Sequence, residues 1–269
     1  MAIEKPKLHV VSFSGGKDST AMLLRMIEEK MPIDDILFCD TGLEFPEMID
    51  HINKVEKYIE RPITRIKSER NFMWYATEKP VTRRTAKVSG IKPGDNEYGY
   101  GWPNMFTRWC TSNLKTDVIK RYLQELINKY EIVQYVGIAS DEPKRIKEGK
   151  RYPLVQWGMT EKECLQYCYN RGFNWNGIYD IWDRISCYCC PLQSLEDLRK
   201  LKKYRPELWE NLRRMDEALS KTCRPNFKFT KSFTDIELRF EVEDEFISHD
   251  KKLRTKEFFQ TLRDRGINY

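Results

Sequence analysis

The chain has 269 residues, of which 33% are charged and 40% hydrophobic, and its formal net charge is +6. No run approaches the roughly 20 apolar residues that span a bilayer, and residues 1–7 lead almost directly into an apolar run without a signal-peptide pattern. We therefore exclude a membrane protein, expect a cytoplasmic one, and note that the spread positive charge suits a polyanion such as a nucleotide or nucleic acid.

The first half of the chain alternates apolar runs with helical patterns. Strand-like composition occurs in residues 8–13, 35–39, 62–66 and 132–138. Helical spacing occurs in residues 18–30, 46–60 and 113–130. Strands separated by helices of this length predict a parallel sheet with right-handed crossovers. We predict an α/β fold with a doubly wound, mostly parallel sheet in residues 1–182, followed by a helical, cysteine-bearing extension in residues 183–269.

A glycine-rich loop joins the first predicted strand to the first predicted helix. Its glycines let the backbone approach an anion, the helix N-terminus adds a partial positive charge, and the lysine adds a full one. A turn that only connects two elements is the alternative, which this combination of residues makes improbable. The nucleotide phosphates are therefore predicted to bind Ser12, Ser14, Gly15, Gly16, Lys17, Asp18 and Ser19. Of these, Lys17 and Asp18 are also predicted to be catalytic.

The second predicted strand ends in Cys39-Asp40-Thr41-Gly42-Leu43-Glu44-Phe45-Pro46. In an open parallel sheet, ligands bind outside the carboxyl ends of the strands, so Asp40, Thr41 and Gly42 are expected to face the same crevice as the loop. Asp40 could bind a Mg²⁺ ion that bridges the phosphates, and it is also predicted to be catalytic. An ordinary strand-to-helix turn is the alternative.

Residues 83–109 interrupt the pattern with glycine, proline and aromatic residues. A loop of this length inside a compact domain is usually functional, and we interpret it as a lid or substrate wall. Farther along the chain, Thr160 and Glu163 form a capping box that predicts a helix ending near Gly172. Two more helices are predicted from Ser194 and Pro206.

The eight cysteines are many for a reducing compartment, in which clustered cysteines indicate metal or redox chemistry. The segment Cys187-Tyr188-Cys189-Cys190-Pro191 contains Cys-x-x-Cys-Pro, a pattern that is common at iron–sulfur sites. Zinc and a redox dithiol are the alternatives. By contrast, Cys39, Cys164 and Cys168 are predicted to be thiols of the hydrophobic core.

Four segments of the chain resemble known enzymes. Ser-Gly-Gly-Lys-Asp-Ser resembles the signature of the ATP pyrophosphatases, or PP-loop enzymes, and Asp-Thr-Gly-x-x-Phe-Pro resembles the phosphoadenosine phosphosulfate (PAPS) reductase family of that superfamily. Cys110-Thr111-x-x-Leu114-Lys115 is similar to another element of that family. So is the run from Gly137 to Arg145, which Pro153-Leu154 and Trp157 follow. Together these elements cover about residues 8–190.

The resemblance implies an adenine nucleotide alpha-hydrolase-like fold that binds ATP, or PAPS or adenylyl sulfate. It places Gly137 in the nucleotide site and offers Arg145 as a second catalytic cation. Two departures matter. No cysteine follows Cys223, although PAPS reductases carry a nucleophilic cysteine in their tail, and Lys17 and Asp18 are retained, although reductases tend to have lost them. Both departures favour a relative that consumes ATP, such as the DNA-phosphorothioation sulfurtransferases.

These observations predict an ATP-dependent sulfurtransferase that adenylates an acceptor (DNA, tRNA or a small molecule), releases pyrophosphate and uses a sulfur donor. One alternative is an iron–sulfur reductase of adenylyl sulfate or PAPS that uses an external thiol. Another is a non-catalytic nucleotide-binding subunit of a nucleic-acid modification complex, and a homodimer fits as well. The resemblance places Cys110 beside the nucleotide, with Cys223 or Cys189 as the fourth ligand. We predict a [4Fe–4S] cluster on Cys110, Cys187, Cys190 and Cys223.

Overall fold

A computed structural model describes residues 5–81, 98–185, 187–228 and 230–267 of the chain. The chain divides into two compact units, and two separate stretches build each of them. Unit 1 consists of Met1–Asn71 and Cys110–Tyr188, and unit 2 consists of Phe72–Trp109 and Cys189–Tyr269. The predicted lid thus belongs to unit 2, and its residues 83–97 lie outside the described part. A division of the chain at residue 182 stays a prediction.

Unit 1 is built on four parallel strands in the order β3-β2-β1-β4. They are β1 (Lys7–Ser12), β2 (Asp35–Asp40), β3 (Thr64–Lys67) and β4 (Glu131–Val136). Between β1 and β4 the direction of strand order reverses, so the carboxyl end of β1 lies at a topological switch point. The predicted parallel sheet is confirmed.

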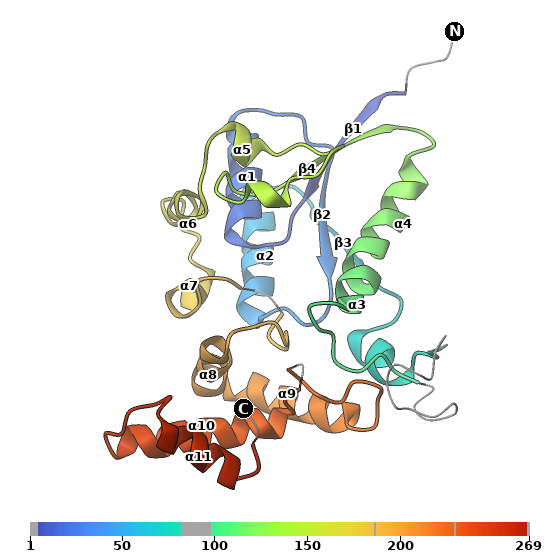
Figure 1. Ribbon diagram of the computed structural model, residues 1–269. Helices are drawn as coiled ribbons and strands as arrows, with labels where there is room; N and C mark the ends of the chain where they lie inside the picture. The colour runs from blue at the N-terminus through green and yellow to red at the C-terminus, as the bar shows by residue number, and fades with distance from the viewer. Residues whose placement is uncertain (1–4, 82–97, 186, 229, 268–269) are drawn as a thin grey trace. The chain divides into compact units, whose positions relative to one another are not determined.

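Helices cover both faces of this sheet (Figure 1). The helices α1 (Lys17–Glu28) and α2 (Pro46–Ile59) lie on one face, and α4 (Asp117–Leu126) lies on the other. Helix α1 buries Ala21, Met22 and Leu23 completely. Helix α2 begins at Pro46, where the missing N–H group costs nothing. The arrangement confirms the doubly wound α/β fold.

Shorter elements complete unit 1, and the first residue of the first of them, Trp109, belongs to unit 2. They are α3 (Trp109–Thr111), η2 (Ser112–Thr116), η3 (Pro143–Arg145), α5 (Pro153–Gln156), α6 (Glu161–Tyr169), η4 (Trp175–Gly177) and α7 (Ile178–Ile181). Helix α6 begins at the predicted capping box, in which the Thr160 amide donates to Glu163 and the Glu163 amide donates to the Thr160 hydroxyl. The helix packs along α1, so this local signal fixes an element that borders the glycine-rich loop.

Unit 2 is helical, as predicted for the C-terminal region. It contains η1 (Trp74–Glu78), α8 (Leu195–Tyr204), α9 (Pro206–Leu219), α10 (Phe233–Ser248) and α11 (Lys256–Asp264). Its core is aromatic, since Trp102 packs edge-on against Phe227 at 4.8 Å between ring centroids. The Trp102 indole N–H also donates to Asp216 of α9 at 2.7 Å. These contacts join the Phe72–Trp109 stretch to the C-terminal helices.

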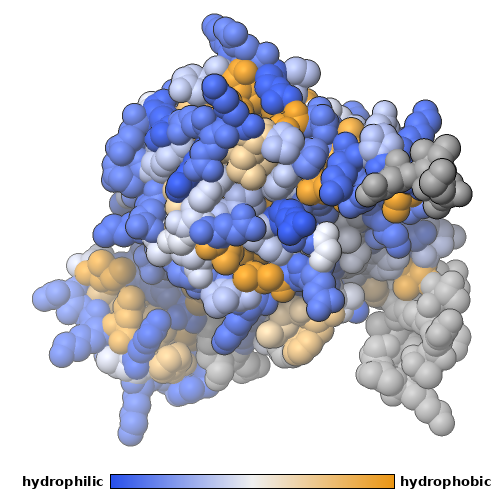
Figure 2. Space-filling model, turned by 90° about the horizontal axis from the view of Figure 1, so that it is seen from above, coloured by the Kyte–Doolittle hydropathy of each residue, from blue (hydrophilic) through white to orange (hydrophobic). Residues whose placement is uncertain are grey.

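Within the described residues, no helix combines the length and apolar character needed to cross a membrane. On the face shown in Figure 2, hydrophilic residues predominate and hydrophobic residues form small separate groups.

Candidate functional site

A cavity of about 210 Å³ opens at the carboxyl ends of β1, β2 and β4 in unit 1. Open α/β sheets bind their ligands at such a switch point. Its walls are formed by Ser12, Phe13, Ser14, Ser19, Leu37, Phe38, Cys39, Lys115, Ile119, Val136, Gly137 and Arg145. The structure thus brings together five residues predicted from separate motifs, namely Ser12, Ser14, Ser19, Gly137 and Arg145. Lys115 was not predicted as a site residue, although the Cys-Thr-x-x-Leu-Lys element contains it.

Two glycines make this site possible because their neighbours leave no room for a side chain. Gly15 has a φ of +79°, and a Cβ atom there would lie 2.7 Å from the Met48 sulfur. At Gly137, a Cβ atom would lie 2.7 Å from the Ser19 Cα atom. The end of β4 therefore approaches the first turn of α1 more closely than any other residue type would permit.

Lys17 is almost buried, with 7% of its surface exposed. Its ammonium donates to the Glu161 carboxylate at 2.6 Å and lies 3.7 Å from the Asp18 carboxylate. A phosphate ligand that contacts the Lys17 ammonium therefore competes with Glu161. Sequence reasoning missed Glu161, because its partner lies 144 residues away and its only local mark is its place in the first turn of a capped helix.

The ion pairs continue beyond Lys17. Arg184 contacts Glu161 at 3.2 Å and Glu142 at 2.5 Å, and Glu142 also pairs with Arg145 at 2.5 Å. With Lys17 and Asp18 added, three cations face three carboxylates, so the network is neutral overall. It can accept an anionic phosphate together with a metal cation without gaining a large net charge. Arg184 carried no sequence signal.

Asp18 is held in an environment that disfavours its charged form. Its Oδ1 atom is buried and has no hydrogen-bond partner among the described residues. Burial raises the pKa of Asp18 from its ordinary 3.8 to about 6, with Glu161 and Glu142 adding to the rise and Lys17 opposing it. A buried carboxylate oxygen without a hydrogen-bond partner is suited to coordinate a metal cation.

Asp18→Asn is expected to stabilise the protein at neutral pH. Because the folded-state pKa lies above the ordinary value, the folded state binds the proton more tightly, and stability from this group falls as pH rises from about 4 to 6. The variant removes that loss, so its free energy of unfolding should exceed that of the wild type by about 1–3 kcal/mol at pH 7 and match it near pH 4. Urea unfolding at both pH values measures this, and a less stable variant at pH 7 would contradict the assignment.

The predicted Asp40-Thr41-Gly42 segment forms a tight turn at the end of β2. The Gly42 amide donates to the Asp40 carboxylate at 2.8 Å, and the Thr41 hydroxyl donates to Glu44 at 2.7 Å. Among the described residues that line the cavity, none comes from this turn. The Asp40 carboxylate thus accepts a hydrogen bond within its own turn, and the preceding residue, Cys39, lines the cavity.

The glycine-rich loop is supported from behind by the segment that contains η4 and α7. The Trp175 indole N–H donates to the Gly15 carbonyl at 2.8 Å, and the Lys17 amide donates to the Tyr179 hydroxyl at 3.0 Å. Trp175 also stacks on His51 with 4.2 Å between ring centroids, and burial lowers the pKa of His51 to about 3, so this ring is neutral. No motif marks Trp175 or Tyr179, because both act across more than 150 residues of sequence.

The structure describes all eight cysteines, and none of them forms a disulfide. Cys39, Cys164 and Cys168 are buried, as predicted, and Cys39 in addition lines the cavity. Burial raises the pKa of Cys39 to about 11 and that of Cys164 to about 12. These thiols therefore stay protonated and are poor ligands.

A lysine accompanies each outer thiol of the Cys-x-x-Cys pattern. In unit 1, burial tends to lower the pKa of Lys115, but Cys187, Glu44 and Cys39 outweigh this effect and raise it. In unit 2, burial lowers the pKa of Lys228, and the neighbouring Cys190 opposes the shift. Positive charges near both sulfur atoms would balance thiolate ligands, so these two residues fit a metal or an iron–sulfur cluster.

The two remaining predicted ligands lie one in each unit. Cys110 is in α3, and the Cys223 thiol donates to the Gly99 carbonyl at 3.0 Å. Among the described residues, no group of three or more His, Cys, Asp or Glu side chains is arranged as a metal site. The cluster on Cys110, Cys187, Cys190 and Cys223 therefore stays a prediction.

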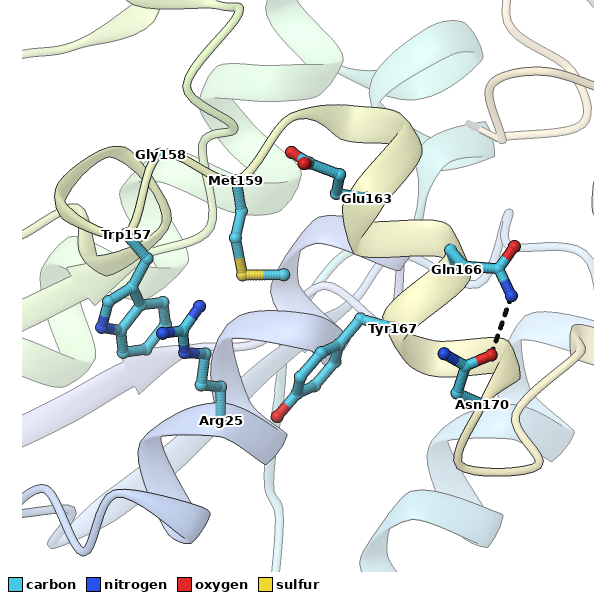
Figure 3. A pocket seen from close by; sticks show the side chains of 8 residues that line it. All are labelled: Arg25, Trp157, Gly158, Met159, Glu163, Gln166, Tyr167 and Asn170. Atoms are coloured by element: carbon cyan, nitrogen blue, oxygen red, sulfur yellow. Dashed lines mark hydrogen bonds between the residues drawn. The ribbon is translucent and has the colours of Figure 1, made fainter.

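A further hollow of about 370 Å³ lies beside α1 and α6 (Figure 3). Its two charged lining residues, Arg25 and Glu163, are already engaged. Arg25 stacks over the Trp157 ring at 4.5 Å and donates to Glu29 at 2.8 Å, whereas Glu163 belongs to the capping box. The hollow is thus less suited to a charged ligand than the cavity at the glycine-rich loop.

Residues 8–193, more than half of the chain, match the phosphoadenosine phosphosulfate reductase domain family. The chain belongs to this family. The match confirms the resemblance to this family that the sequence motifs indicated.

The individual proteins that this chain is similar to share less than a third of its residues. An uncharacterized protein of Methanocaldococcus jannaschii is 29% identical over 77% of this chain and 41% of its own length, so this chain spans less than half of that relative. Among solved structures, PAPS reductase from Candida auris in its phosphate complex is 18% identical and covers 66% of this chain and 80% of its own, with a TM-score of 0.43. The U34-tRNA thiolase NcsA from Methanococcus maripaludis with its [4Fe-4S] cluster is 17% identical and covers 82% and 76%, with a TM-score of 0.35.

Proposed function

We propose that this PAPS reductase-family protein binds Mg-ATP and transfers its adenylyl group to an acceptor, as the first half of an ATP-dependent sulfur transfer. The observation that carries the proposal is the Lys17–Asp18 pair at the first turn of α1, beside the cavity. PAPS and adenylyl sulfate have no β–γ pyrophosphate for this pair to hold. A triphosphate with its metal ion uses both charges.

The chemistry of the site fits Mg²⁺. Asp18 would hold the ion through its buried, unpartnered Oδ1 atom, because magnesium prefers carboxylate and phosphate oxygens. Burial raises the pKa of Asp18, and Glu161 and Glu142 add to the rise. A nearby cation would relieve the repulsion among these carboxylates. Bound there, the ion would neutralise negative charge on the phosphates. Asp40 is a second candidate ligand.

Different residues of the protein would bind the adenosine and the phosphates of the nucleotide. Adenosine would lie in the cavity against the apolar walls from Leu37, Phe38 and Val136. The amides at the start of α1 and the Lys17 ammonium would hold the β- and γ-phosphates, with Arg145 on the cavity wall near the α-phosphate. An acceptor oxygen would then form a bond to the α-phosphorus while the bond between the α-phosphorus and the leaving pyrophosphate breaks. These cations would stabilise the negative charge that develops on the phosphate oxygens.

For the second half of the reaction, we propose that Cys110, Cys187, Cys190 and Cys223 hold a [4Fe–4S] cluster. The spacing of the thiols and the lysines near Cys187 and Cys190 support this proposal. With a thiolate on each iron, such a cluster would have no open position; held by only three of these thiolates, it would supply one open iron at which sulfide can be held. The acceptor would be DNA, tRNA or a small molecule.

The deciding experiment compares the products of different nucleotides. Anaerobically purified protein should release pyrophosphate from Mg-ATP in the presence of its acceptor, and it should release no sulfite from PAPS or adenylyl sulfate with a thiol reductant. Sulfite without pyrophosphate would assign a reductase instead. Tight ATP binding without turnover of any of these substrates would assign a non-catalytic subunit.

A further inference from the structure

The hydroxyl of Tyr179 lies at the glycine-rich loop. The Lys17 amide donates to the Tyr179 oxygen at 3.0 Å. A Cβ atom built on Gly16 would lie 3.6 Å from the Ser14 hydroxyl oxygen and 3.7 Å from the Tyr179 oxygen. The hydroxyl groups of Ser14 and Tyr179 therefore both lie beside Gly16 of the glycine-rich loop.

The Tyr179 hydroxyl has a proton to give. A tyrosine hydroxyl can accept and donate at the same time, and here the oxygen already accepts from the Lys17 amide. Among the described residues, no acceptor takes the Tyr179 proton. Burial raises the pKa of Tyr179, although the bond from the Lys17 amide opposes the shift. The group therefore remains protonated and is a donor.

A strained segment holds this hydroxyl in place. Trp175 and Asn176 have φ values of +48° and +52°, a left-handed conformation that bulky residues rarely adopt. The Trp175 indole is fixed by its bond to the Gly15 carbonyl, and its ring meets the Tyr179 ring edge-on at 4.8 Å between centroids. Strain that is kept at a ligand site commonly serves positioning.

We propose that Tyr179 donates its hydroxyl proton to a phosphate oxygen of the nucleotide bound at residues 14–19. The inference rests on the proposed function, because it assumes a polyphosphate at this loop. The Lys17 amide, the Tyr179 hydroxyl and the phosphate would form a chain in which each hydrogen bond polarises the next. Tyr179 would thus contribute to affinity for the phosphate tail and not to affinity for adenosine.

Tyr179→Phe tests this role, because it keeps the ring contact with Trp175 and removes only the hydroxyl. Calorimetry should show about 10- to 100-fold weaker binding of ATP and pyrophosphate, with adenosine affinity unchanged. Tyr167→Phe is the matched control, since the Tyr167 hydroxyl donates to Glu28 near the end of α1, whereas the Tyr179 hydroxyl bonds to Lys17 at the glycine-rich loop. It should bind all three ligands like the wild type.

The alternative is that the hydroxyl only holds the Lys17 amide. Its removal would then free an amide donor at the loop, and ATP would bind as tightly as before or more tightly, which would overturn the proposal. Wild-type protein that binds neither ATP nor pyrophosphate would instead contradict the proposed function.

Site-specific 3,5-difluorotyrosine at position 179 gives a second measurement that does not depend on the stability of the phenylalanine variant. The fluorinated residue keeps the oxygen that accepts from Lys17 but loses its proton at lower pH. As the fluorinated phenol ionises, the ATP affinity of this protein should fall relative to that of the wild type at the same pH. The nearby Lys17, Asp18, Cys168 and Glu161 are present in both proteins, so their titration does not affect the comparison. Parallel pH profiles would overturn the donor role.

Discussion

Lys17→Ala is expected to lower pyrophosphate release by about 100- to 1,000-fold, the usual effect of removing one donor that stabilises developing charge. Lys17 is the nearly buried cation of the first turn of α1. The fold should survive, because the Glu161 side chain is 24% exposed and water can solvate its carboxylate once its partner is gone. A steady-state pyrophosphate assay with Mg-ATP, together with a thermal unfolding curve, measures both effects.

Glu161→Gln is the matched comparison for Lys17→Ala. It removes the carboxylate that competes with phosphate for the Lys17 ammonium at 2.6 Å, so ATP should bind at least as tightly as to the wild type. If Lys17→Ala retained the wild-type rate, the glycine-rich loop would not be the catalytic phosphate site. If Glu161→Gln lost activity to the same extent, the ion pair itself would be the working unit.

Cys187→Ser and Cys190→Ser are each expected to remove most of the iron and acid-labile sulfide from anaerobically purified protein. Each substitution removes one thiolate of the Cys-x-x-Cys pair, whose two ligands are close together in the sequence and are expected to bind the cluster jointly. Iron, zinc and sulfide analysis of the same samples distinguishes a cluster from a zinc site, which contains no sulfide.

Cys164→Ala is the control for these two variants. Its thiol is fully buried in α6, and burial raises its pKa to about 12, so metal content should match that of the wild type. Unchanged iron in both Cys187→Ser and Cys190→Ser would refute the ligand assignment. Zinc without sulfide in the wild type would replace the cluster by a zinc site.

Local patterns in the sequence predicted the framework of unit 1. The apolar runs gave the strands, the glycine-rich loop marked the start of α1, and the capping box at Thr160 marked the start of α6. Each of these signals lies within a few residues of the element that it specifies. The same is true of Gly137, whose place in the cavity followed from its motif at the end of β4.

Long-range contacts explain what sequence reasoning missed. Glu161 and Arg184 reach the glycine-rich loop through ion pairs between elements far apart in the chain. Trp175 and Tyr179 support the loop from a segment whose left-handed backbone has no recognisable sequence pattern. Likewise, residues 83–109 were interpreted as a lid or substrate wall, and the sequence did not indicate that Trp102 in this stretch contacts Phe227 and Asp216, which follow more than 100 residues later.

The discontinuous construction of unit 2 has a consequence for biosynthesis. As the nascent chain leaves the ribosome, Trp102 emerges long before Asp216 and Phe227, against which it is buried to 1% exposure in the finished protein. Until α9 is synthesised, this indole remains an exposed hydrophobic group that chaperones can recognise. Premature termination after unit 1 would leave the same aromatic surface permanently uncovered, and the truncated product would aggregate.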